Sequence, residues 1–182
     1  QWRGNRDLKL PEPMPESTDL ALLAYTGGTT GLPKGAIHTH AMMEAMAKCM
    51  EGLYHTSISE DIWLNVAPVS HIWGWCVSLV TPMYGCNTVV LVPKFIPDVV
   101  VAEIARTKAT IFAGGPSVIY NALLAVPTLR ETDLSRLRLC LGGGADFAHA
   151  TIEAWEDATK NTVHELWGMS EAAPLSGNPS DR

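Results

Sequence analysis

The stretch "YTGGTTGLPKG", residues 25–35, decides how the rest of the sequence is interpreted. It follows an apolar run, "LALLA" (20–24), and combines glycines with three threonines and Lys34. Glycine lets the backbone come close to a ligand, and hydroxyl and ammonium groups are donors that suit phosphate oxygens. The spacing matches neither the G-x-x-x-x-G-K-[ST] phosphate loop nor the G-x-G-x-x-G dinucleotide fingerprint. The stretch therefore predicts a phosphate-binding loop of another kind, with a ligand-free glycine-rich hairpin as the alternative.

The composition is that of an ordinary globular domain. The 182 residues are 47% hydrophobic and 18% charged. The net charge of −6 and the scattered basic residues argue against a nucleic-acid partner. No apolar run is long enough to span a bilayer, so we expect no transmembrane segment. Cys49, Cys76, Cys86 and Cys140 lie in apolar segments without C-x-x-C spacing, which predicts buried thiols and a reducing, cytoplasmic compartment.

Short apolar runs alternate with longer helical patterns along the chain. Most of the apolar runs are continuous, as in strands that are covered on both faces. This alternation predicts right-handed βαβ units on a mostly parallel sheet flanked by helices, an α/β fold. The predicted strands are 20–26, 62–67, 87–92, 109–114, 137–143 and 162–167, and the predicted helices are about 40–53, 72–83, 98–107, 116–126 and 147–160.

The two ends of the sequence suggest a piece of a larger protein. Residues 1–19 are polar and spaced by prolines, which is typical of a linker, so we expect a linker at a cut N-terminal end. The final "SGNPSDR" (176–182) is rich in turn-forming residues. Residues 20–182 are predicted to form one central α/β unit.

Glycine and polar residues follow most of the predicted strands at the point where each strand ends. Ligands bind at the carboxyl ends of parallel strands, so these segments predict an active site at one edge of the sheet. The segments are "TGGTTG" (26–31), "PVSH" (68–71), "GGPS" (114–117), "GGGAD" (142–146) and "GMSE" (168–171).

Each segment also has a purely structural interpretation. "GGGAD" (142–146) suits either a flat ligand lying on bare backbone or a tight turn before a helix, and the residues alone leave both open. Trp167 could stack on a planar ring and Glu171 could bind Mg²⁺, although a core Trp and a solvated Glu are favoured by these residues alone. His38 and His40 are interpreted as polar residues of a first helical turn, and no second ligand at metal spacing accompanies His71.

Taken together, four segments resemble one family. "YTGGTTGLPKG" resembles the Thr/Ser-Gly-Thr-Thr-Gly-x-Pro-Lys-Gly loop of the AMP-forming adenylating enzymes, which include acyl-CoA synthetases, luciferases and peptide-synthetase adenylation domains. "PVSHIWG" is similar to their Pro-x-x-His-x-x-Gly segment, "LCLGGGADF" to Ser-Gly-Gly-Ala-Pro-Leu, and "LWGMSE" to Tyr-Gly-Met-Thr-Glu. All four occur in the family's order, and the resemblance runs from about residue 20 to the end.

Several positions depart from the family's pattern. Gly27 stands where Ser is common, and Gly142 and Asp146 replace the usual Ser and Pro. Trp167 replaces Tyr and Ser170 replaces Thr, which keeps a ring and a hydroxyl. The resemblance places the family's ribose-binding Asp, its hinge and its C-terminal lid with a catalytic Lys beyond Arg182. We therefore expect this chain to be part of the large domain and to be inactive alone.

The resemblance implies ATP-dependent activation of a carboxylic acid to an acyl-adenylate, followed by transfer to coenzyme A, with Mg²⁺ as the metal. The implied catalytic residues are Thr26, Lys34, His71 and Glu171, and the implied metal ligands are Thr26 and Glu171. The implied phosphate contacts are Thr26, Gly27, Gly28, Thr29, Thr30, Gly31 and Lys34. The implied adenine side is Gly143, Gly144, Ala145, Asp146, Glu165, Leu166, Trp167, Gly168, Met169 and Ser170. The implied acyl-substrate contacts are His71, Trp75, Gly115 and Gly143.

The substrate class follows from finer likenesses. "PVSHIWGW" and "ELWGMSE" look more like acyl-CoA synthetases than like peptide-synthetase domains. Trp75 stands where fatty-acyl members have an aromatic gate, which favours a medium- or long-chain fatty acid. The alternatives are an aryl- or amino-acid-adenylating domain or, for this chain alone, a nucleotide-binding or inert module.

Overall fold

Six strands form the central sheet in the computed structural model, which describes residues 12–26, 31–56 and 59–180. The strand order is β4-β3-β5-β6-β7-β8, with parallel pairing up to β7 and an antiparallel β8 at the edge. This confirms the predicted α/β class. The strands are β3 (Ile62–Asn65), β4 (Thr88–Leu91), β5 (Ile111–Gly115), β6 (Leu139–Gly143), β7 (Val163–Met169) and β8 (Ala172–Gly177).

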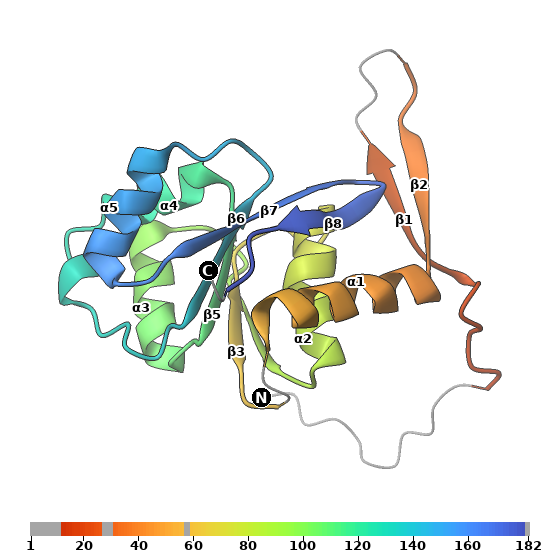
Figure 1. The fold of residues 1–182 in the computed structure, drawn as a ribbon, viewed down its shortest axis with the longest axis horizontal. Helices are drawn as coiled ribbons and strands as arrows, with labels where there is room; N and C mark the ends of the chain where they lie inside the picture. Colours follow the sequence, from red (N-terminus) through yellow and green to blue (C-terminus); the bar gives the residue numbers. More distant parts are fainter. Residues whose placement is uncertain (1–11, 27–30, 57–58, 181–182) are drawn as a thin grey trace.

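Helices cover both faces of the sheet. Figure 1 shows α3, α4 and α5 on one face and α1 and α2 on the other. The helices are α1 (His40–Tyr54), the π-helix η1 (Trp73–Val80), α2 (Thr81–Tyr84), α3 (Pro97–Thr107), α4 (Ser117–Leu124), the 3-10 helix η2 (Leu129–Glu131) and α5 (His149–Thr159). Thr39 caps α1, as its hydroxyl accepts a hydrogen bond from the Met42 amide at 3.3 Å. In the described residues, no helix is both long and apolar enough to cross a membrane.

Alternate residues of each central strand pack into two separate cores. Phe112 and Cys140 face the core under α3, α4 and α5, whereas Ile111 and Leu141 face the core under α1 and η1. Because both faces are buried, these strands are apolar at successive positions, which is the pattern expected of a covered parallel sheet. The prediction that these strands are covered on both faces is therefore confirmed for the central strands.

The first predicted strand, 20–26, does not belong to this sheet. β1 (Leu20–Thr26) pairs antiparallel with β2 (Lys34–Thr39) in a separate two-stranded hairpin that projects beyond the sheet (Figure 1). Its inner side rests on a small third core, made by Met43, Ile72, Cys76 and Ala173, whereas its outer side is exposed. The expectation that this run is covered on both faces was wrong. An apolar run predicts a strand, but it does not show which elements pack on each face of that strand.

Three further expectations need correction, and a fourth is not tested by the described residues. His38 lies in β2 and is fully buried instead of opening a helix. Cys49 and Cys86 are exposed, whereas burial raises the pKa of the Cys76 and Cys140 thiols to about 12. The predicted helix 72–83 is a π-helix followed by one α-helical turn, and strand β8 was not predicted. The linker predicted over 1–19 lies mostly outside the described residues and stays a prediction.

A buried carboxylate joins three strands at the amino-terminal edge of the sheet. Asp61, 3% exposed, accepts hydrogen bonds from Arg138 Nε at 3.0 Å and Nη2 at 2.6 Å. Thr110 Oγ1 donates to the same carboxylate at 2.7 Å and accepts from the Ile62 amide at 3.0 Å. Since these residues stand just before or at the start of β3, β5 and β6, the network fixes the relative position of the three strands.

Replacing Asp61 with Asn should lower the free energy of unfolding by about 2 kcal/mol, because two charge-assisted hydrogen bonds are weakened in a dry site. The measurement is a urea unfolding curve of the purified protein that contains this chain. Asp157→Asn is the matched control, since the Asp157–Arg130 pair at 2.8 Å is exposed on both sides and should contribute below about 1 kcal/mol. Equal losses in the two variants would contradict the role of the Asp61 network.

Candidate functional site

The parallel strands end at a common edge, and the chain changes direction there. After β3 the chain proceeds to β4 on one side, whereas after β5 it proceeds to β6 on the other side. Such a switch point opens a crevice beyond the carboxyl ends of the two strands. Two cavities lie along this edge, one beyond β3 and β5 and one beyond β6 and β7.

The larger cavity, of about 630 Å³, lies beyond β6 and β7. Eight of the residues predicted for the adenine side line this cavity. They come from two segments that are separate in the sequence, 143–146 and 165–168. Trp167 is 63% exposed there, so its ring face is open to a ligand and is not part of the core. Met169 and Ser170 lie farther along and do not line this cavity. The lining is Gly143, Gly144, Ala145, Asp146, Phe147, Glu165, Leu166, Trp167, Gly168, Ser176, Gly177 and Asn178.

The smaller cavity, of about 280 Å³, lies at the switch point between β3 and β5. His71 reaches it from the loop after β3, and its Nδ1 accepts a hydrogen bond from the Trp73 amide at 3.1 Å. When the ring is neutral, Nε2 therefore carries the proton and is the donor available to a ligand. The rest of the lining is mostly apolar: Val66, Ala67, Pro68, Trp73, Gly114, Pro116, Ile119, Gly143 and Gly144.

Gly143 and Gly144 line both cavities, and the structure requires a glycine at the first. A Cβ on Gly143 would lie 2.1 Å from the Leu166 carbonyl oxygen and 2.7 Å from the Trp73 ring. Gly144 has a φ of +80°, a left-handed conformation that favours glycine. The strand before them is held by Tyr120, whose buried hydroxyl donates to the Leu141 carbonyl at 2.8 Å. Burial raises the pKa of Tyr120 well above its usual value, so it stays a donor.

Trp73 is the indole that lines the smaller cavity, and Trp75 lines neither cavity. Residues two positions apart on a helix do not face the same way, and η1 turns Trp75 toward the third core beneath the hairpin. Gly115 also stays outside the cavity lining, although a Cβ there would lie 3.6 Å from Trp73 Nε1. The structure therefore brings His71 and Gly143 together at this cavity but does not bring Trp75 to it.

The hairpin carries the predicted phosphate contacts. Thr26 and Lys34 are paired at its end, where Thr26 Oγ1 donates to the Lys34 carbonyl at 3.4 Å. Gly31 is exposed in the connection, and Gly27, Gly28, Thr29 and Thr30 lie outside the described residues. The sequence of residues 25–35 can be interpreted either as a phosphate-binding loop or as a ligand-free hairpin. A hairpin can also bind phosphate, so the two interpretations are compatible.

Glu171 is exposed in the two-residue turn between β7 and β8. His38 of the hairpin contacts the Ser170 carbonyl in this turn, and Thr26 lies roughly 13 Å along β1 from Leu22, the partner of His38. Thr26 and Glu171 are thus on neighbouring elements, and no hydrogen bond between them is present in the described residues.

Sequence reasoning missed three residues of the larger cavity, Ser176 and Gly177 at the end of β8 and Asn178 just after it. A Cβ on Gly177 would lie 2.5 Å from Leu166 Cδ2 and 2.8 Å from the Tyr54 hydroxyl, so β8 packs tightly beside β7. Pro174 and the glycine weakened the strand pattern of this segment. The turn residues Ser170 and Glu171 are not an Asn-Gly or Asp-Gly pair, so no local hairpin signal pointed to β8.

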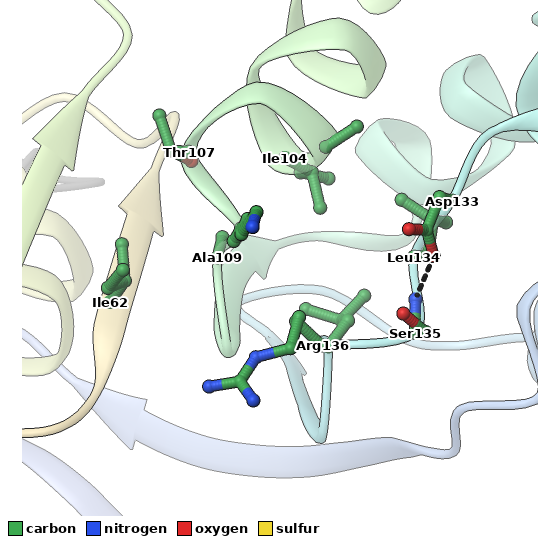
Figure 2. Close-up of a pocket in the computed structure, with 11 residues that line it drawn as sticks. Ile62, Ile104, Thr107, Ala109, Asp133, Leu134, Ser135 and Arg136 are labelled. Atoms are coloured by element: carbon green, nitrogen blue, oxygen red, sulfur yellow. Dashed lines mark hydrogen bonds between the residues drawn. The ribbon is translucent and has the colours of Figure 1, made fainter.

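A third cavity, of about 460 Å³, lies at the opposite edge of the sheet (Figure 2). Figure 2 shows Ile62 at the start of β3, Ala109 and Arg136 in the segments that lead into β5 and β6, and Ile104 on α3. None of the predicted site residues lines it. The carboxyl edge remains the place where the predicted residues gather.

The amino-acid sequence matches the family of AMP-binding enzymes over residues 1–182. It is 34% identical to the long-chain-fatty-acid–CoA ligase of Bacillus subtilis (strain 168) over 170 residues, which are 93% of this chain and 30% of that relative. It is 31% identical to the mitochondrial malonate–CoA ligase of Mus musculus over 175 residues, 87% of this chain and 29% of that relative. Among solved structures, ATP-bound MatB from Rhodopseudomonas palustris has a TM-score of 0.83 at 30% identity, covering 92% of this chain and 33% of that chain.

The chain thus spans about a third of the length of these proteins. The family match nevertheless covers the whole chain, and the likeness in structure includes the sheet whose carboxyl edge holds both cavities. On this evidence the chain belongs to the AMP-binding enzyme family.

Proposed function

We propose that the protein that contains this chain activates a fatty acid with ATP and transfers the acyl group to coenzyme A. The observation that carries the proposal is that a cavity suited to a nucleotide and an apolar cavity meet at Gly143 and Gly144. A carboxylate held in the apolar cavity would there meet the α-phosphate of a nucleotide held in the other. Bringing two substrates together in this way is a large part of what an enzyme contributes to a bimolecular reaction.

The first step needs no general base. A carboxylic acid is already ionised at neutral pH, and its oxygen attacks the α-phosphorus while pyrophosphate leaves. In the second step the thiol of coenzyme A gives up its proton to solvent, the thiolate attacks the acyl carbon, and AMP leaves. Because the first step brings anions together, donors and cations that neutralise charge at phosphorus matter most. In this proposal Lys34 and the Thr26 hydroxyl contact the phosphates, and the Nε2 proton of His71 faces the carboxylate.

The proposed adenine contacts are the exposed Trp167 ring and the bare backbone of residues 143–145. An aromatic ring stacked on a base contributes about 1–3 kcal/mol to binding. The absence of side chains at Gly143 and Gly144 lets a flat ring system come close to the backbone. Gly143 must be a glycine in any case, because a Cβ there would clash with the Leu166 carbonyl and the Trp73 ring.

Mg²⁺ would bind between Glu171 and the phosphates, with Thr26 on the hairpin side. The described residues contain no group of three His, Cys, Asp or Glu side chains that could hold a metal. This fits Mg²⁺, which is commonly held by one or two carboxylates together with substrate phosphates and water. The metal would neutralise charge on the phosphates during attack.

The lining of the smaller cavity favours a fatty acid over a dicarboxylic acid. Its described lining residues include no Lys or Arg, and His71 is the one titratable side chain among them. A malonate-like substrate carries a second carboxylate, which is costly to bury without a cation. The similarity to a malonate–CoA ligase and to MatB makes a dicarboxylic acid the second candidate.

The free thiols, two of them exposed, fit the reducing cytoplasm that we propose as the location.

The test is acid-dependent release of pyrophosphate from ATP by the natural protein that contains this sequence. Octanoate, palmitate, benzoate and malonate are compared at equal concentration, each with and without coenzyme A. We expect the fatty acids to give the highest kcat/KM and an acyl-CoA product. Highest activity with malonate would replace the fatty-acid assignment, and no release with any acid would contradict the proposed function.

Trp167→Ala should raise the KM for ATP about tenfold, because the loss of one stacking contact costs about 1–3 kcal/mol. The exposed ring contributes little to folding, so the melting temperature should stay within a degree or two. Trp167→Phe keeps a smaller ring and should recover most of the affinity. An unchanged KM for ATP in the alanine variant would remove Trp167 from the nucleotide site.

Trp73→Phe should shift the preferred fatty acid toward longer chains, because it enlarges the smaller cavity. Each additional buried CH₂ contributes about 0.8 kcal/mol, or roughly fourfold in relative kcat/KM per carbon. Trp75→Phe removes the same atoms from a ring outside the cavity and should leave the preference unchanged. The measurement is kcat/KM across a series of saturated acids, and a shift in the Trp75 variant alone would restore Trp75 as the gate.

A further inference from the structure

His38 lies at the point where the hairpin meets the β7–β8 turn. It stands in β2, its side chain is 0% exposed, and its Nε2 is 2.7 Å from the carbonyl oxygen of Ser170. Ser170 precedes Glu171 in the turn. The His38 side chain therefore joins the element that carries Thr26 and Lys34 to the turn that carries Glu171.

The direction of this hydrogen bond follows from the partner. A carbonyl oxygen only accepts, so Nε2 carries the hydrogen and donates it. When the ring is neutral, the other ring nitrogen, Nδ1, is an acceptor, and it is buried without a hydrogen-bond partner in the described structure. A buried acceptor without a partner is unfavourable. The ring is thus held in a dry place where only its Nε2–H makes a polar contact.

Strand alternation puts the proposed phosphate contacts on the same side of the hairpin as His38. Lys34 and His38 are four positions apart on β2, so their side chains point to the same side of the strand. Their partners on β1, Thr26 and Leu22, point to that side as well. The side of the hairpin that His38 faces is the side packed on the third core, where Leu22 and Ala24 lie. Thr26 and Lys34 therefore face the same direction as the contact with Ser170.

The other contacts at this junction are apolar. Leu22 and Ala24 pack with Ala173 and Ile72 in the third core. Hydrophobic contact has little directional preference, so it holds the surfaces together without fixing how far one element slides along the other. A hydrogen bond of 2.7 Å is directional and does fix that position. In the described parts of the chain, His38 supplies the side-chain hydrogen bond between the hairpin and the turn.

We propose that His38 is a positioning residue that fixes the β7–β8 turn, and with it Glu171, against the hairpin that carries Thr26 and Lys34. Its catalytic consequence rests on the proposed function, whereas its effect on the turn does not. Without the Nε2–H donor, the Ser170 carbonyl loses its partner and the turn is free to shift. The spacing between Glu171 and the hairpin would then vary, and with it the geometry of the proposed Mg²⁺–phosphate site.

The first experiment measures the turn itself by hydrogen–deuterium exchange in the natural protein that contains this chain. His38→Met removes the donor at similar length, and His38→Gln keeps an N–H donor near the position of Nε2. Leu22→Val is the matched control, because Leu22 pairs with His38 across the hairpin and lies in the third core. We expect peptides covering residues 168–173 to exchange several-fold faster in His38→Met only.

The second experiment measures pyrophosphate release with a fatty acid as a function of Mg²⁺ at saturating ATP. Misplacement of a catalytic group by about 1 Å can cost up to a hundredfold in rate. We expect His38→Met to lower kcat by ten- to a hundredfold and to raise the Mg²⁺ concentration at half-maximal rate, with the KM for the fatty acid unchanged. His38→Gln should recover most of kcat, and Leu22→Val should lower the melting temperature without moving the Mg²⁺ dependence.

The outcomes separate this proposal from the proposed function. Unchanged exchange of the turn in His38→Met, or equal acceleration in Leu22→Val, would overturn the positioning role. Faster exchange in His38→Met with recovery in His38→Gln supports it, even if the natural protein releases no pyrophosphate with any acid. In that last case the proposed function fails and the role of His38 in the fold stands. Faster exchange together with an unchanged Mg²⁺ dependence in an active enzyme would overturn the link between His38 and the metal site.

Discussion

The approach of Gly143 to the backbone of Leu166 and to the ring of Trp73 is the constraint on which the site depends. A Cβ at this position would overlap the Leu166 carbonyl oxygen at 2.1 Å, so any other residue would push β6 and β7 apart or displace Trp73. The larger cavity is bounded by the ends of β6 and β7, and the smaller one by Trp73. One missing side chain therefore keeps the two cavities adjacent and gives both of them a floor of bare backbone.

The sheet supports this approach from the other edge. At the amino-terminal edge, Asp61, Thr110 and Arg138 hold β3, β5 and β6 in register through short hydrogen bonds. Between the two edges, the central strands are buried on both faces. A sheet fixed in this way presents its carboxyl-edge loops from a rigid base, which is how binding residues on loops acquire precise positions. The Asp61–Arg138 pair and the two cavities thus lie at opposite ends of the same sheet.

Much of the fold could be predicted from the sequence, and so could the edge of the sheet where the candidate site residues gather. Continuous apolar runs such as 109–114 reported a covered parallel strand, and the glycines after β6 marked the edge where ligands bind. The apolar pattern of Leu20–Thr26 could not show that this strand pairs with β2 outside the main sheet, because the pattern of one strand does not identify its pairing partner. The family resemblance indicated Trp75 as the gate, whereas the structure places Trp73 at the smaller cavity and Trp75 beside the third core, because residues two positions apart on a helix face different sides.

The site is divided between two parts that are held by different interactions. The two cavities at the carboxyl edge are built on the sheet, whose cores are extensive. In the described residues, the hairpin rests on a core of four buried residues and one side-chain hydrogen bond to the β7–β8 turn, and its outer face exposes Tyr25 and Ile37 to solvent. Elements with few buried contacts open at lower free energy than the core. A nucleotide bound as proposed would therefore contact two parts of the structure that differ in local stability, and the His38–Ser170 hydrogen bond is a directional contact that joins the less stable part to the sheet.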